Sequence, residues 1–109
     1  MKIREDYFNT YEFENQLNIS VGDNYRFSAM AILTHILKLP STKILAQKSW
    51  VLTDDFQAEF EFKDHVFVMY TPMDSVDIAP LDQSVSNEIT AELYAHIKLF
   101  KSASFFDRL

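Results

Sequence analysis

The residue types that most suggest chemistry are Glu61 and Lys63, which form a Glu-x-Lys sequence around Phe62. In metal-dependent nucleases with a D…E-x-K signature, a neighbouring aspartate and the glutamate bind Mg²⁺ while the lysine orients the attacking water. The aspartates that precede this sequence most closely are Asp54 and Asp55. If they extend the same strand as Glu61, Asp55 lies about 20 Å from it at roughly 3.3 Å per residue, so the two carboxylates cannot share a metal ion.

These residues therefore predict a strand with a charged outer face rather than an active site. Asp77 follows the Glu-x-Lys pair, which is the wrong order for the motif. A negatively charged surface also repels the phosphates of a nucleic-acid substrate. We predict that the protein is not an enzyme, binds no nucleic acid and uses no metal ion or other cofactor.

Other residues that commonly carry catalysis form no recognisable motif. Cysteine is absent, which excludes disulfides, cysteine-ligated metals and thiol catalysis. The three histidines, His35, His65 and His96, lack the spacing of a zinc site, and we interpret His96 as a hydrogen-bonded residue at the edge of the core. The alternative is a small-molecule-binding domain or small enzyme with a pocket between sheet and helices, where His96 or His35 titrates near neutral pH.

The residues around the Glu-x-Lys sequence alternate as they do in a half-buried strand. The apolar positions are Ala58, Phe60 and Phe62, and the charged positions between and after them are Glu59, Glu61 and Lys63. A turn at residues 63–65 and an apolar run over 66–71 predict an antiparallel hairpin of residues 56–63 with 66–71. A further turn at 71–74 precedes a third strand that ends at Pro80 and directs Asp77 outward.

Amphipathic helices are predicted before and after these strands. The first covers residues 24–39, capped by Asp23 or Asn24 and closed by Pro40. Its apolar stripe is Ala29, Ile32, Leu33 and Ile36, widened by Phe27, Met30 and Leu37. The second covers residues 86–100, capped by Ser86, with Ile89, Leu93, Ile97 and Phe100 on its apolar side.

Two further segments complete the predicted α+β fold. Residues 16–21 are predicted as a short strand. Residues 42–49 fit either a helix or a strand, and the N-cap-like Ser41 and Thr42 favour a short helix that leads into a strand over residues 50–52. We therefore predict an antiparallel sheet of three to five strands with helices packed on one face and the charged face open.

The length of 109 residues predicts a single domain over residues 1–109 with a modest core. A hydrophobic content of 48% is well above that of disordered chains. The sequence shows no secretory leader and no apolar run long enough for a membrane span, so we expect a cytoplasmic protein without membrane partners.

The net charge of −6 is unevenly distributed along the chain. Residues 53–82 contain eight acidic residues and one lysine, a net charge of −7, whereas residues 27–52 contain three lysines and no acidic residue. This segregation favours a basic protein as the partner. The alternative is a solvated acidic surface that only maintains solubility.

A hairpin reading "AEFEFKDHVFVMY", followed by "TPMDSVDIAP" and a final amphipathic helix, occurs here in an acidic chain without cysteine. In this overall character the whole chain resembles the small bacterial immunity proteins of contact-dependent growth inhibition. Those proteins neutralise a cognate toxin domain, frequently a basic nuclease, by covering its active site or substrate surface with acidic and aromatic residues.

The resemblance and the charge distribution together predict a protein that binds and neutralises a basic toxin domain encoded by a neighbouring gene. Charge at such an interface raises the association rate and the specificity, while a few buried aromatic residues supply most of the affinity. The residues predicted to contact the partner are Asp54, Asp55, Glu59, Glu61, Asp64, Asp74 and Asp77.

Overall fold

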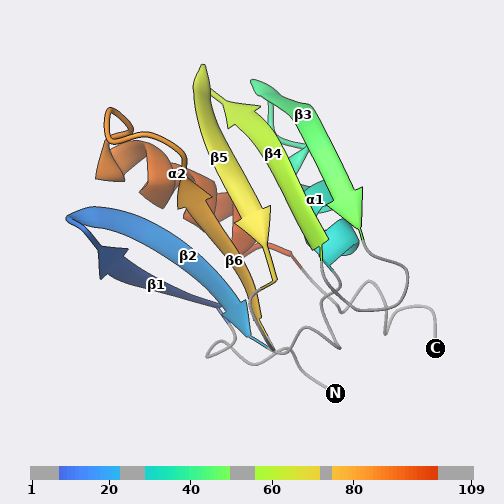
Figure 1. The fold of residues 1–109 in the computed structure, drawn as a ribbon, viewed down its shortest axis with the longest axis horizontal. Helices are drawn as coiled ribbons and strands as arrows, with labels where there is room; N and C mark the ends of the chain where they lie inside the picture. The colour runs from blue at the N-terminus through green and yellow to red at the C-terminus, as the bar shows by residue number, and fades with distance from the viewer. Residues whose placement is uncertain (1–7, 23–28, 50–55, 72–74, 101–109) are drawn as a thin grey trace.

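The described part of the chain forms one six-stranded antiparallel sheet with two helices against one of its faces (Figure 1). The computed structural model describes residues 8–22, 29–49, 56–71 and 75–100. The strand order across the sheet is β1-β2-β6-β5-β4-β3. In chain order the elements are β1 (Phe8–Phe13), β2 (Gln16–Gly22), α1 (Ala29–Ile36), β3 (Thr42–Ser49), β4 (Phe56–Phe62), β5 (His65–Tyr70), β6 (Ser75–Pro80) and α2 (Asn87–Ile97).

The α+β class and the antiparallel sheet are confirmed, but the sheet has six strands rather than three to five. The four central strands are the ones that the sequence predicts, and the additional strands, β1 and β3, form its two edges. Of the six β1 side chains only Phe8 is buried. An edge strand contacts the sheet on one side only, so its sequence needs less of the apolar alternation by which strands are recognised.

The prediction of a short helix over residues 42–49 is wrong, because these residues form β3. A β-bulge between Ile44 and Ala46 inserts one extra residue and shifts the register with β4. The alternation is therefore interrupted in the middle of the strand, which makes a strand resemble a helix in sequence. The strand expected over residues 50–52 lies outside the described residues.

Two-residue turns close the hairpins β1–β2 and β4–β5. Glu14 and Asn15 have φ angles of 53° and 65°, and Lys63 and Asp64 have φ angles of 52° and 67°. Positive φ at both central residues is the requirement of a type I′ turn, whose twist matches that of the paired strands. The turn places Glu61 at the last open-face position of β4 and ends the strand before Lys63.

The first helix buries the predicted stripe of Ala29, Ile32, Leu33 and Ile36 against the sheet. Met30 and Leu37, which the sequence places on the same apolar surface, are exposed instead, so the buried stripe is narrower than predicted. The regular helix ends at Ile36 and tightens into i→i−3 hydrogen bonds before Pro40. Phe27 and the predicted cap lie outside the described residues.

The second helix begins at the predicted N-cap, where the Ser86 hydroxyl accepts a hydrogen bond from the Ile89 amide at 3.4 Å. Leu93 and Ile97 are fully buried against the sheet. Tyr94 donates a hydrogen bond from its hydroxyl to the Phe8 carbonyl at 2.9 Å and so ties α2 to the β1 edge. Neither helix of the described segments is long and apolar enough to span a membrane.

The core lies between the sheet and the helices. At its centre the rings of Phe60 and Phe67, on the paired strands β4 and β5, stack with centroids 5.7 Å apart. Residues at alternate positions point the other way, to the sheet face that carries no helix, which we call the open face (Figure 1). This open face is where the candidate site lies.

Candidate functional site

The structure describes four of the seven residues predicted to contact a partner. Glu59 and Glu61 lie on β4 and Asp77 on β6, all at open-face positions, and Asp64 lies in the β4–β5 turn. The remaining three, Asp54, Asp55 and Asp74, lie outside the described residues. The alternation of β4 and β6 therefore gathers the carboxylates of separate strands on one face.

The β4 carboxylates have no partner within the chain as described. Glu59 and Glu61 are half-buried, although they lie on the outer face that the sequence predicts. Their cross-strand neighbours on β5 are Val68 and Val66, which are themselves only partly covered. No hydrogen bond or ion pair of the described segments involves either carboxylate. These two charges are thus available to a binding partner, beside an apolar strip.

Asp77 differs from the β4 carboxylates because its oxygens are occupied. The hydroxyls of Ser20 and Ser75 both donate to Oδ1 at 2.9 Å, and the Tyr11 hydroxyl donates to Oδ2 at 3.1 Å. Asp77 is half-buried rather than freely exposed, which corrects the expectation from the sequence. Its carboxylate joins β1, β2 and β6 on the open face, which is first of all a structural role.

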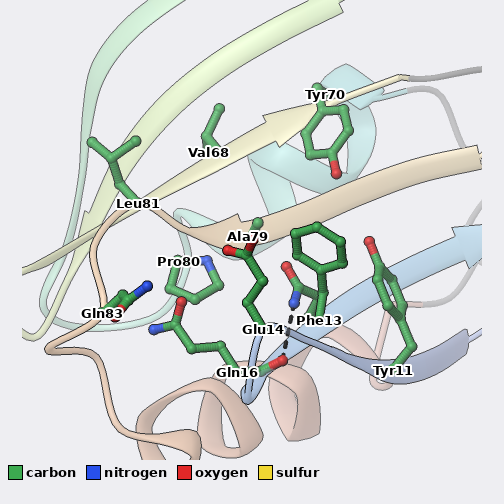
Figure 2. Close-up of a pocket in the computed structure, with 11 residues that line it drawn as sticks. Tyr11, Phe13, Glu14, Gln16, Val68, Tyr70, Ala79, Pro80, Leu81 and Gln83 are labelled. Carbon is green, nitrogen blue, oxygen red and sulfur yellow. Dashed lines mark hydrogen bonds between the residues drawn. The ribbon is translucent and has the colours of Figure 1, made fainter.

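The hydroxyl of Tyr11 is held in its protonated form. Burial raises the pKa of this hydroxyl far above its ordinary value, and the nearby Tyr70 hydroxyl and Asp77 carboxylate raise it further. Figure 2 shows the hydroxyls of Tyr11 and Tyr70 pointing toward one another from the two sides of the open face. Tyr11 is therefore a fixed hydrogen-bond donor to Asp77 and a fixed aromatic wall of the site.

A hollow of about 490 Å³ opens on this face beside the β1–β2 hairpin (Figure 2). The hairpin contributes one side of it, β5 contributes the opposite side, and the end of β6 with the following turn closes one end. Eleven of the described residues line it: Tyr11, Phe13, Glu14, Gln16, Asn18, Val68, Tyr70, Ala79, Pro80, Leu81 and Gln83. We call this feature the aromatic hollow, after Tyr11, Phe13 and Tyr70.

Two amide side chains that line the aromatic hollow keep acceptor atoms without partners. The Gln16 amide nitrogen donates to the carbonyls of Asp82 and Val85 at 2.9 and 3.4 Å, and the buried Asn18 donates to the Gln16 carbonyl at 3.1 Å. Because these amide nitrogens are occupied, Oε1 of Gln16 and Oδ1 of Asn18 remain as acceptors without partners in the described segments.

The sequence did not reveal the aromatic hollow. The acids Glu59, Glu61 and Asp77 were recognisable from alternation, but Tyr11 and Phe13 belong to the edge strand that was not predicted. The available signal was the spacing of Asn9, Tyr11 and Phe13 at every second position before Glu14 and Asn15. Pairing of β1 with β2 and of β2 with β6 then brings Tyr11 next to Asp77.

The two side chains of the Glu-x-Lys sequence do not converge. Glu61 lies on the open face, whereas the Lys63 ammonium forms an ion pair at 2.5 Å with Glu92 of α2, on the helix-covered side. Asp77 lies two strands and four residues of register from Glu61, about 16 Å by strand geometry. Within the described ranges no group of three acidic or histidine residues could hold a metal ion.

The histidines of the alternative prediction join the two helices. The rings of His35 on α1 and His96 on α2 stack with centroids 4.1 Å apart, and each Nε2 lies 2.7 Å from the other residue's backbone carbonyl. Since a carbonyl only accepts, both Nε2 atoms carry a proton. Burial lowers the pKa of His35. Neither histidine lines the aromatic hollow, and the hollow lies on the open face rather than between sheet and helices.

Comparisons with known proteins gave no match to a family model, to a curated protein or to a solved structure. The functional assignment therefore depends on the geometry and charge of the open face.

Proposed function

We propose that this protein is a binding protein that docks a basic protein domain on the open face of its sheet. The observation that carries the proposal is the pair of half-buried, unpartnered carboxylates of Glu59 and Glu61 beside Val66 and Val68. A carboxylate partly shielded from water gains most from a cationic partner, and the apolar strip next to it supplies area for burial.

The charge of the chain supports a basic partner. The acidic segment, residues 53–82, carries −7, and its described part supplies the open-face carboxylates of β4 and β6. The lysines of residues 27–52 include Lys43, which lies on the edge strand β3 opposite Glu61 in the β3–β4 register. Part of the positive charge of this segment therefore lies at the edge of the sheet. A basic protein surface approaching the sheet is attracted over a range set by the Debye length.

We further propose that the bound protein is a toxin domain and that this chain neutralises it without catalysis, as the immunity proteins that it resembles do. Acidic and aromatic residues occur together on the open face, where Tyr11, Phe13 and Tyr70 adjoin the carboxylates. This combination suits the occlusion of a basic active site or substrate surface, because charge directs the encounter and aromatic residues supply affinity.

The aromatic hollow favours a second candidate, a domain that binds a small cationic molecule. A volume of about 490 Å³ falls within the range of small-ligand pockets. The neighbouring genes discriminate the two candidates. A large secreted protein with a variable C-terminal domain beside this gene favours toxin neutralisation, and an operon of metabolic enzymes favours the small ligand.

The proposed function is tested by producing the C-terminal domain of the neighbouring large protein in cells with and without this chain. The expected result is that the domain stops growth when alone, that the chain restores growth, and that the two copurify in a fixed ratio. Growth arrest that persists with the chain present at equal or greater abundance contradicts the proposal.

A further inference from the structure

We propose that the aromatic hollow is the receptor for an arginine side chain of the protein partner. The inference rests on the proposed function, since it names the chemical group that the open face recognises. It depends on three properties of the hollow: its aromatic walls, its unoccupied acceptors and its charge.

The aromatic walls suit a planar cation. Tyr11 and Tyr70 stand on opposite sides, and Phe13 is 63% exposed at the end of β1, although a phenylalanine is ordinarily buried (Figure 2). A guanidinium group stacks on aromatic faces and is more weakly hydrated than an ammonium group, so it loses less by leaving water. These walls therefore favour arginine over lysine.

The unoccupied acceptors match the donors of a guanidinium group. Gln16 and Asn18 both line the hollow, and their amide nitrogens are bound to backbone carbonyls, which leaves Oε1 and Oδ1 as acceptors without partners in the described segments. Arginine brings five N–H donors and no acceptor, which is the complement of such a lining.

The charge of the hollow selects a cation. Glu14 is the one carboxylate among the eleven lining residues, and none of these residues is basic. The Asp77 carboxylate, which accepts a hydrogen bond from the Tyr11 hydroxyl, adds negative potential. A guanidinium group stacked on the aromatic walls can pair with the Glu14 carboxylate through its remaining N–H donors.

The hollow is preformed, which lowers the entropy lost on binding. Gln16 is tied to the turn after β6 through Asp82 and Val85, and the Tyr11 ring is tied to Asp77. The neighbouring Leu17 amide donates to the Asn87 side chain at the start of α2, at 2.9 Å. The β1–β2 hairpin is thus held at several points, and a ligand need not order it.

The first experiment uses capped tripeptides as probes, acetyl-Gly-Arg-Gly-amide and its citrulline and lysine counterparts, titrated into the isotopically labelled protein and followed by NMR. We expect millimolar binding of the arginine peptide, with shifts concentrated at Tyr11, Phe13, Asn18 and Tyr70. Citrulline has the same shape without charge and should bind at least several-fold more weakly, with lysine between them. Equal shifts for arginine and citrulline, or shifts centred elsewhere, overturn the inference.

Two variants locate the binding. Phe13→Ala removes an exposed wall, and Glu14→Gln removes the carboxylate; each should weaken arginine-peptide binding about two- to fivefold. The matched control is Leu99→Ala, which truncates an equally exposed apolar residue beyond α2 and should leave binding unchanged. Circular dichroism verifies that each variant is folded. Unchanged binding in Glu14→Gln, which alters no buried atom, is enough to refute the assignment.

A second experiment separates failure of this inference from failure of the proposed function. In the complex with the neighbouring gene's toxin domain, Phe13→Ala should raise the dissociation rate about tenfold or more, as expected for an anchor residue. A complex that forms normally and is insensitive to Phe13→Ala and Glu14→Gln overturns the arginine receptor but leaves the proposed function intact. Absence of any complex overturns the proposed function itself.

Discussion

Replacing Asp77 by alanine should destabilise the protein, although Asp77 lies on the face proposed for partner binding. The substitution removes the acceptor of three hydroxyl groups, those of Tyr11, Ser20 and Ser75. Once the carboxylate is absent, the serine hydroxyls, which lie in partly buried positions, have only limited access to water as a replacement.

The expected loss follows from the burial of these three bonds. A hydrogen bond to a charged group contributes roughly 1.5 to 3 kcal/mol when buried, and we take about 0.5 to 1 kcal/mol for each of these because water reaches them. The total is about 2 kcal/mol, which lowers the melting temperature by about 8 to 15 °C in a domain of this size. Glu59 and Glu61 make no hydrogen bond in the described segments, so Glu59→Ala and Glu61→Ala should each change the unfolding free energy by less than about 0.5 kcal/mol.

The assay is urea unfolding followed by circular dichroism, with the free energy extrapolated to water. Tyr11→Phe supplies a second arm, because it keeps the ring and removes one of the three donors. A double-mutant cycle between Tyr11→Phe and Asp77→Ala should give a coupling free energy of about 0.5 to 1 kcal/mol. If Asp77→Ala is no more destabilising than Glu59→Ala, the distinction between a structural carboxylate and two free ones is refuted.

Three further predictions concern the helices and turns. Burial lowers the pKa of His35 from 6.5 in the folded protein, so the unfolded chain takes up the proton more readily and the unfolding free energy should fall as the pH drops below 6.5. His35→Gln should flatten this pH dependence in urea midpoints measured from about pH 7.5 to 5.5. The same slope in the variant and the wild type contradicts the role of His35. Asp64 has a φ of 67°, a left-handed conformation that glycine adopts freely and a β-branched residue does not. Asp64→Gly should therefore leave the unfolding free energy unchanged or raise it, while Asp64→Val should lower it by about 1 to 2 kcal/mol. Equal thermal stability of the two variants contradicts the turn assignment. Ser86→Ala should lower the unfolding free energy by about 1 kcal/mol through loss of the cap on α2, whereas Ser86→Asp, which keeps a capping acceptor, should lower it less, and an equal loss in both variants contradicts the cap.

The central part of the fold is predictable because its signals are local. Strands β4 and β6 each bury one face, so Ala58, Phe60 and Phe62 recur at every second position. The second helix has both a cap at Ser86 and an apolar stripe through Leu93 and Ile97. In these segments the local preference and the tertiary packing agree, and the predicted elements are confirmed.

The edges of the fold are not predictable from the same signals. The β1 strand buries only Phe8, and the bulge at Ile44 and Ala46 interrupts the alternation of β3. In the first helix, Met30 is apolar but exposed, because the sheet covers only the narrower stripe of that helix. Apolar character alone does not specify which side of an element meets the core.

The candidate site was predictable only in its charges. Alternation is sufficient to place Glu59 and Glu61 on one face, because that inference needs no knowledge of the strand order. The contact of Tyr11 with Asp77 spans 66 residues of sequence and depends on β2 lying between β1 and β6. The aromatic hollow likewise requires residues of four strands, β1 and β2 from one part of the chain and β5 and β6 from another, so a search of the sequence alone could not assemble it.

The most direct test of the central claim, that the open-face carboxylates recognise a basic protein, is the association rate of the chain with the neighbouring gene's toxin domain. The double variant Glu59→Gln with Glu61→Gln should associate about three- to tenfold more slowly at low salt, and this difference should shrink at about 0.5 M salt, where the Debye length is about 4 to 5 Å. The matched control, Glu88→Gln with Glu92→Gln on α2, changes the net charge equally and should associate almost as fast as the wild type. Equal slowing by both double variants would mean that only net charge matters, and wild-type rates in the β4 variant would contradict the claim outright.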